Sequence, residues 1–267
     1  MAGLKERFKP RIDTERIKRG IFESQVWRSA FRHGYEDTPR NRVLMVVDNV
    51  WLHLHPTKIR RHAIRIRFTW CMGGMTFLLY LVTVVTGVVL MFYYRPVGEY
   101  AYQDMKYLEF DAPFGMFVRN MHRWAAHAMV IAVWMHMLRV FMTGSYKPPR
   151  EFNWVVGVVL LTLTLLLSFT GYLLPWDQLS IWAVTVGTNM ARATPFLGYE
   201  GPFAEQLGVI TPRYDARALL LGGTVVGTPT LLRFYVLHCI VIPIVASLFM
   251  VVHFWRIRKD GGISGPL

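Results

Sequence analysis

The sequence predicts an all-α membrane protein built as a bundle of four transmembrane helices. Composition is the first reason, because 53% of the 267 residues are hydrophobic, more than soluble domains of this size carry. Three long segments without a charged residue are the second: 68–94, 152–176 and 234–255 each exceed the roughly 20 residues that cross a bilayer. The third is that much of the net charge of +13 precedes residue 68, beside the first of these segments.

Local patterns predict the elements in order. Residues 1–41 are basic, polar and without periodicity, and we expect a solvated arm on the anionic membrane face rather than a nucleic-acid-binding segment. Residues 42–66 should form an amphipathic surface helix followed by a linker. The helix is expected within 42–55 and should end near Pro56. The rest, 67–267, should be a four-helix domain. Its helices are expected at about 68–94, 114–143, 152–174 and 231–256.

The distribution of Lys and Arg outside the spans predicts the topology. Most of these residues precede the first span, separate the second from the third, or follow the fourth. The positive-inside rule therefore places both termini on the cytoplasmic, negative side. No apolar signal sequence with a cleavage site is recognisable, so insertion is expected to depend on the spans. The long connection between the third and fourth helices should contain interfacial helices.

Within the spans, four of the nine histidines form two pairs. His122 and His136 are 14 residues apart in the second span, and His238 and His253 are 15 apart in the fourth. Each helix thus presents two imidazoles on one side, about 21 to 22 Å apart along its axis. One such histidine would be explained by a hydrogen bond to a neighbouring helix. Two pairs at two depths suit the axial ligation of haem iron, whereas zinc would need more ligands.

Two glycine pairs share this period. They are Gly73 and Gly87 in the first span and Gly157 and Gly171 in the third. Glycines in spans commonly serve helix packing, but a flat macrocycle at each histidine level also needs backbone without Cβ beside it. We therefore expect the bundle to enclose two b haems, one above the other. Nearby Arg119, Arg123 and Arg139 could pair with haem propionates or snorkel to the interface.

Motifs between residues 67 and 267 resemble the cytochrome b family, and within it the short, split form typified by cytochrome b6. These motifs are Cys71-Met72-Gly73-Gly74, Phe92–Pro96, His122-Arg123-Trp124, Lys147–Glu151, Thr170–Gln178 and Ile263–Leu267. Each is weak alone, but their order and the histidine and glycine spacing make the resemblance specific. It implies the redox subunit of a quinol:cytochrome c or plastocyanin oxidoreductase, a Rieske/cytochrome b complex.

The resemblance also implies roles for individual residues. The positive-side b haem would use His122 and His238, and the negative-side b haem His136 and His253. Quinol oxidised at the positive side would give one electron to a Rieske protein and the other, through both haems, to quinone at the negative side, with proton translocation. Cys71 matches a cysteine that bonds covalently to an extra c-type haem; by composition alone it would be an inert buried thiol. The implied quinone-site residues are Tyr172, Pro175, Trp176, Ala183 and Arg258.

The partners implied by the resemblance are a subunit IV-like protein, a Rieske iron–sulfur protein and a c-type cytochrome, in a dimeric complex surrounded by membrane lipid. The subunit IV-like protein would complete the quinol site, because this sequence lacks the Pro-Glu-Trp-Tyr motif of longer relatives. The long basic arm favours the bacterial cytoplasmic membrane over a thylakoid. Two alternatives stay open: a dihaem membrane anchor of a dehydrogenase or hydrogenase, and a transporter with a histidine proton relay.

Overall fold

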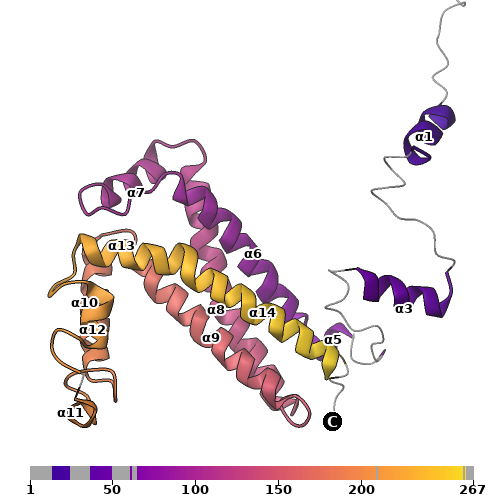
Figure 1. Cartoon of the computed structure of the whole chain (residues 1–267). Coiled ribbons are helices and arrows are strands. Elements are labelled where there is room, and N and C mark those ends of the chain that lie inside the picture. Colours follow the sequence, from indigo (N-terminus) through magenta and orange to yellow (C-terminus); the bar gives the residue numbers. More distant parts are fainter. Residues whose placement is uncertain are drawn as a thin grey trace, which may run out of the picture. The chain divides into compact units, whose positions relative to one another are not determined.

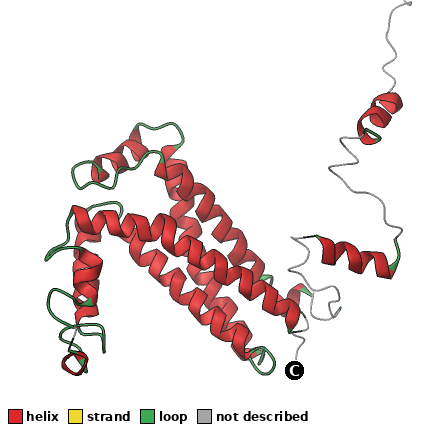
Figure 2. Cartoon of the chain, viewed as in Figure 1, coloured by secondary structure: helices red, strands yellow, loops and turns green. Residues whose placement is uncertain are grey.

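The computed structural model describes residues 14–24, 37–49, 61, 65–208, 210–260 and 262. Within these residues the chain is almost entirely helical (Figure 2). The one β-type pairing among them is an isolated bridge between Thr211 and Tyr214. The chain divides into two units, Met1–His53 and Leu54–Leu267. The functional boundary expected at residue 67 stays a prediction.

The described part of the first unit contains two helices, α1 (Thr14–Phe22) and α3 (Pro39–Asp48). α3 begins earlier than the predicted surface helix because Thr38 caps it: the Thr38 hydroxyl accepts a hydrogen bond from the Asn41 amide at 3.2 Å. Pro39 fits the first helical turn, where no amide donor is needed. The predicted helix extended to 55, but 50–55 lie outside the described residues, as does most of the arm.

Four long helices form the bundle of the second unit (Figure 1). They are α6 (Met72–Met91), α8 (Gly115–Met142), α9 (Glu151–Tyr172) and a continuous helix, Thr228–Lys259, made of α13 (Thr228–Val236), the π-helical turn η1 (Leu237–Val241) and α14 (Ile242–Lys259). Each is long and apolar enough to cross a membrane, which confirms the four predicted spans. α6 packs chiefly against α8, and α14 against α9.

The first span begins later than predicted. Trp70 and Cys71 both have a φ of 50°, in the left-handed region, and they separate a short helix, α5 (Ile66–Thr69), from α6. Residues other than glycine rarely adopt this backbone conformation. The apolar sequence around residue 68 predicted a continuous helix, since hydropathy carries no information about such a break. Cys71 therefore lies at the N-cap of α6.

The fourth span is longer than predicted at both ends. It begins at Thr228, where Pro229 occupies the first turn and the Thr230 hydroxyl accepts a hydrogen bond from the Gly227 amide at 3.2 Å. It continues to Lys259, because basic side chains near a helix C-terminus interact favourably with its dipole.

Shorter helices cover one end of the bundle (Figure 1). Between α9 and α13 lie α10 (Gln178–Arg192), α11 (Ala204–Leu207) and α12 (Ala216–Leu221), as predicted for this connection. α7 (Ala101–Phe110), between α6 and α8, was not predicted, because its polar and apolar residues show no clear helical periodicity. We call the end of the bundle formed by Met91, Gly115, Tyr172 and Thr228 the Trp176 end, and the opposite end the Cys71 end.

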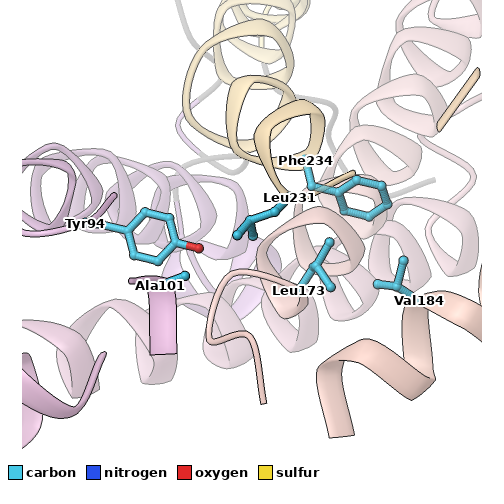
Figure 3. Packing of buried hydrophobic residues seen from close by; sticks show 6 residues of the cluster. All are labelled: Tyr94, Ala101, Leu173, Val184, Leu231 and Phe234. Carbon is cyan, nitrogen blue, oxygen red and sulfur yellow. The ribbon is translucent and has the colours of Figure 1, made fainter. Parts of the chain in front are cut away.

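A buried cluster joins these short helices to the bundle at the Trp176 end (Figure 3). Its members are Tyr94, Ala101, Leu173, Val184, Leu231 and Phe234. The Tyr94 hydroxyl donates to the Leu174 carbonyl at 2.6 Å, and the buried Asp104 carboxylate accepts hydrogen bonds from the Arg95 amide and guanidinium. Nearer mid-depth, the Tyr80 hydroxyl donates to the Pro243 carbonyl at 2.9 Å and ties α6 to α14.

Candidate functional site

The structure brings His122, His136, His238 and His253 together as the two predicted pairs. The ring centres of His122 and His238 are 6.2 Å apart, and those of His136 and His253 are 6.5 Å apart. Since metal–imidazole bonds are about 2 Å long, two imidazoles on opposite sides of one metal ion have ring centres about 6 Å apart. Both pairs therefore have the separation that bis-imidazole ligation of one iron requires.

Hydrogen bonds orient the histidines of the pair nearer the Trp176 end. Nδ1 of His238 donates to the Leu167 carbonyl at 3.0 Å and lies 3.3 Å from the Thr170 hydroxyl. Nδ1 of His122 lies 2.9 Å from the Thr86 hydroxyl, which itself donates to a carbonyl of its own helix. A hydroxyl that donates elsewhere accepts from the imidazole, so the proton is on Nδ1 and Nε2 keeps the lone pair for a metal.

Sequence analysis missed these two threonines, although a signal was present. Thr86 directly precedes Gly87, and Thr170 directly precedes Gly171. The same Thr-Gly pair thus recurs in two spans at the level of one histidine pair. One residue of each pair orients an imidazole, and the other leaves room for one.

The pair nearer the Cys71 end lines a cavity of about 460 Å³. This volume lies within the range typical of small-molecule and cofactor sites. Nδ1 of His253 is buried beside the Asn153 backbone, 14 residues before the Leu167 carbonyl that accepts from Nδ1 of His238. With Nδ1 beside the backbone, as in His238, Nε2 is the nitrogen of His253 left for a ligand in the cavity that His253 and His136 line.

Each of the four predicted glycines lies against an imidazole ring. From the sequence, these glycines are expected to lie beside a macrocycle held between the imidazoles. The distances from a Cβ built on the glycine to the imidazole Cε1 are 3.4 Å for Gly73 and His136, 3.2 Å for Gly87 and His122, 3.8 Å for Gly157 and His253, and 2.5 Å for Gly171 and His238. The absence of a Cβ therefore lets the histidine rings lie against the neighbouring helices. Contact with a macrocycle, expected from the sequence, stays a prediction.

The unequal spacing of the histidines has a structural cause. His238 lies in the π-helical turn Leu237–Val241, whereas α8 is an uninterrupted α-helix between His122 and His136. A π-turn accommodates one extra residue, so the 15-residue spacing in the fourth span matches the 14-residue spacing in the second. The same period then holds for all four helices.

The two glycines of the Cys71-Met72-Gly73-Gly74 motif lie against different side chains. Gly73 faces His136, and a Cβ on Gly74 would lie 2.9 Å from the Cys71 sulfur. Cys71 is exposed and lines the same cavity as His136 and His253. The sulfur, one histidine pair and the cavity thus belong to one region at the Cys71 end.

The three arginines proposed for propionates differ in their surroundings. Arg119 forms an ion pair with Glu109 at 3.3 Å, and Arg123 is exposed. Arg139 lines the cavity beside His136, as does Arg150, which donates to the carbonyl oxygens of Asp260 and Gly262. Among these, Arg139 has the position best suited to an anionic group bound in the cavity.

The predicted quinone-site residues separate into two groups. Tyr172, Pro175, Trp176 and Ala183 all lie at the Trp176 end, where Tyr172 and Ala183 are exposed. Trp176 has a φ of 55°, and its indole nitrogen lies 3.3 Å from where a Cβ on Gly98 would be. Arg258 lies at the opposite end, half-buried near the end of α14.

Comparison with known proteins identifies the family. The family model Cytochrome b/b6/petB matches residues 59–261. The chain belongs to the cytochrome b/b6 family. It is 43% identical over 198 residues to a protein named Cytochrome b6 from Gracilaria tenuistipitata var. liui, a match that covers 74% of this chain and 85% of the relative.

A solved structure described as a hyperthermophilic respiratory Complex III contains a chain that matches this cytochrome b/b6 family member with a TM-score of 0.66 and 28% identity. The match covers 74% of this chain and 49% of the solved one, so the chain spans about half the length of that relative. Together with the four apolar helices, the family makes this an integral membrane protein.

Membership of the cytochrome b/b6 family implies b-type haem, and the residues present fit this group. The fit rests on two imidazole pairs at the separation that one iron between them requires, on the hydrogen bonds that orient His122 and His238, and on the cavity beside His136 and His253. The family also decides against the two alternatives, a dehydrogenase or hydrogenase anchor and a proton-relay transporter.

Proposed function

We propose that this chain is the cytochrome b subunit of a quinol-oxidising, proton-translocating Rieske/cytochrome b complex, a quinol:cytochrome c or plastocyanin oxidoreductase. It binds one b haem between His122 and His238 and a second between His136 and His253. The observation that carries this proposal is the pair of histidine separations, 6.2 and 6.5 Å, on the same two helices. Bound haem supplies one-electron redox chemistry at two depths about 21 Å apart.

The chain's own residues hold the two sites in different ways. Thr86, Thr170 and the Leu167 carbonyl fix the rings of one pair with Nε2 available. At the other pair, Arg139 offers positive charge to propionates, and the apolar helix faces exclude water. The protein thereby sets the orientation of the ligands and the polarity around them, which are its means of tuning a redox potential.

Cys71 is proposed to carry an additional c-type haem. The Cys71 thiol would hold this haem by adding across one of its vinyl groups, an addition in which sulfur bonds to one vinyl carbon, the thiol hydrogen goes to the other, and no oxidant is needed. Support comes from the exposed sulfur, which lines the cavity of the His136 pair. Gly74 leaves the space in which this side chain lies.

The proposed topology puts the Trp176 end at the positive side and the Cys71 end, with both termini, at the negative side of a bacterial cytoplasmic membrane. Quinol oxidation then takes place near Tyr172, Pro175, Trp176 and Ala183, and quinone reduction near Arg258. A subunit IV-like protein, a Rieske iron–sulfur protein and a c-type cytochrome complete the complex, which is dimeric.

A pyridine haemochrome spectrum, taken before and after acid-acetone extraction of the purified complex, tests the proposal. We expect about two extractable b haems per chain and one haem that stays on the polypeptide. Two b haems with nothing retained would refute the covalent haem alone. A folded complex without any haem would refute the proposed function.

Two substitutions separate the haem sites. His136→Ala should remove one b haem and leave the one held by His122 and His238; retention of both would contradict the pairing. Cys71→Ala should abolish haem staining of the denatured chain but keep both b haems. Purification from native membranes should also retain a Rieske protein and a small multi-span subunit, and a chain isolated with neither would contradict the proposed complex.

A further inference from the structure

A histidine lies on the outward face of α8, close to the middle of the span. α8 has 28 residues, and His127 is about 2 Å from its midpoint along the axis. The residue is exposed, and its one described ring contact is with Trp124, at 5.7 Å between centres. Neither ring nitrogen forms a hydrogen bond with any residue that the structure describes.

Such a position is unfavourable if lipid tails are the neighbours. A neutral imidazole carries one donor and one acceptor, and hydrocarbon satisfies neither. Ionisable residues within spans accordingly face other protein groups or water-filled cavities. His127 therefore indicates a protein neighbour at mid-depth, outside the part of the chain that the structure describes.

His127 belongs to a continuous exposed stripe, which we call the α8 outer face. It consists of Trp124, His127, Ile131, Trp134 and Leu138, spaced alternately by three and four residues. The two tryptophans are 69% and 54% exposed, and the inward-facing Met129 is buried. Tryptophan in spans is enriched at the interfaces, where its N–H is hydrated; here both indoles lie within about 9 Å of the helix midpoint.

Exposed polar side chains on other spans differ, because their own helix satisfies them. The Thr162 hydroxyl of α9 donates to the Val158 carbonyl at 3.0 Å, and the Ser247 hydroxyl of α14 donates to the Pro243 carbonyl at 2.8 Å. These side chains require no partner in lipid. The imidazole of His127 has no such hydrogen bond with the described residues of its own helix.

We propose that the α8 outer face docks a transmembrane helix of a second subunit, which places a hydrogen-bonding side chain opposite His127. The proposal rests on the proposed function and deepens it, because it gives the subunit IV-like partner a place on this chain. The length of the solved relative supports this occupant: that chain extends for about as many residues again beyond the part matched here. Spacing by three and four residues is the pattern that a packed helix requires.

Site-specific photo-cross-linking in native membranes tests the contact. A benzophenone amino acid replaces Ile131 on the α8 outer face or, as a control, Val85 on α6; the native side chains are 60% and 63% exposed. We expect the probe at 131 to form an adduct with a transmembrane helix of a different polypeptide and the probe at 85 not to label that helix. Adducts at 131 with only lipid, or with a second copy of this chain, would overturn the proposal.

Substitution of His127 tests the hydrogen bond. His127→Leu should lower the retention of the second subunit in detergent by about threefold or more, whereas His127→Gln, which keeps a donor and an acceptor, should retain it. Equal retention in both variants would overturn the role of His127. Haem content distinguishes failure of this inference from failure of the proposed function. Two b haems together with unchanged retention of the second subunit in His127→Leu would refute only this inference. Absence of haem from the wild-type complex would refute the proposed function.

Discussion

Replacement of Gly171 by alanine should selectively weaken haem binding at the proposed site nearer the Trp176 end. The added Cβ would lie 2.5 Å from Cε1 and 3.0 Å from Nδ1 of His238, whereas ordinary van der Waals contact begins at 3.4 Å. The ring must therefore move by about 1 Å, which corresponds to overpacking that costs about 1–3 kcal/mol. The movement also strains the hydrogen bond to the Leu167 carbonyl, a loss of about 1 kcal/mol.

The combined cost of about 2–4 kcal/mol corresponds to a haem affinity at least about 30-fold weaker at this site. Gly157→Ala is the matched control, because its Cβ would lie 3.8 Å from His253, at ordinary contact distance. Haem content per chain and the low-temperature optical spectrum should show one b haem in the first variant and two in the control. Two unperturbed b haems in Gly171→Ala would refute the reasoning from close contact.

Three further predictions concern polar groups around the Trp176 end. Thr86→Val should leave haem bound at His122 but shift its midpoint potential, because the hydrogen bond to Nδ1 is lost; an unchanged redox titration would contradict this. Tyr94→Phe removes the bond to the Leu174 carbonyl and should lower thermal stability in detergent by about 1 kcal/mol. Asp104→Asn should destabilise the complex at neutral pH by about 1–2 kcal/mol, since Arg95 loses its buried partner. Burial raises the pKa of Asp104, but hydrogen bonds and charge from Arg95 outweigh burial and hold this pKa below its ordinary value. The stabilisation is therefore present at neutral pH and is lost as the pH falls through the lowered pKa, so acid melting curves of wild type and variant should converge there.

Periodicity made the two histidine pairs predictable from the sequence. The spacing between His122 and His136, and the matching glycine spacing, depend only on helix geometry, which is the same in every α-helix. The three charge-free segments likewise indicated three of the four spans, because the bilayer demands a minimum apolar length. The Cys71 motif could be recognised, but the contact of Gly74 with the Cys71 sulfur could not.

Other features depend on contacts between distant segments. The hydrogen bonds of Thr86 and Thr170 to imidazoles join different helices, and hydropathy has no access to such pairs. The break at Trp70 and Cys71 and the π-turn around His238 are backbone states that apolar residues adopt only when packing selects them.

The sequence by itself determined that this protein has four spans and that two histidines lie at each of two depths. Local rules suffice there, since the rise per residue and the thickness of the bilayer do not depend on tertiary contacts. The tertiary structure alone decided which glycine faces which imidazole, which nitrogen is left for a metal, and that His127 points away from the bundle. These outcomes depend on the rotation of each helix about its axis, which is set by the packing of all four helices together.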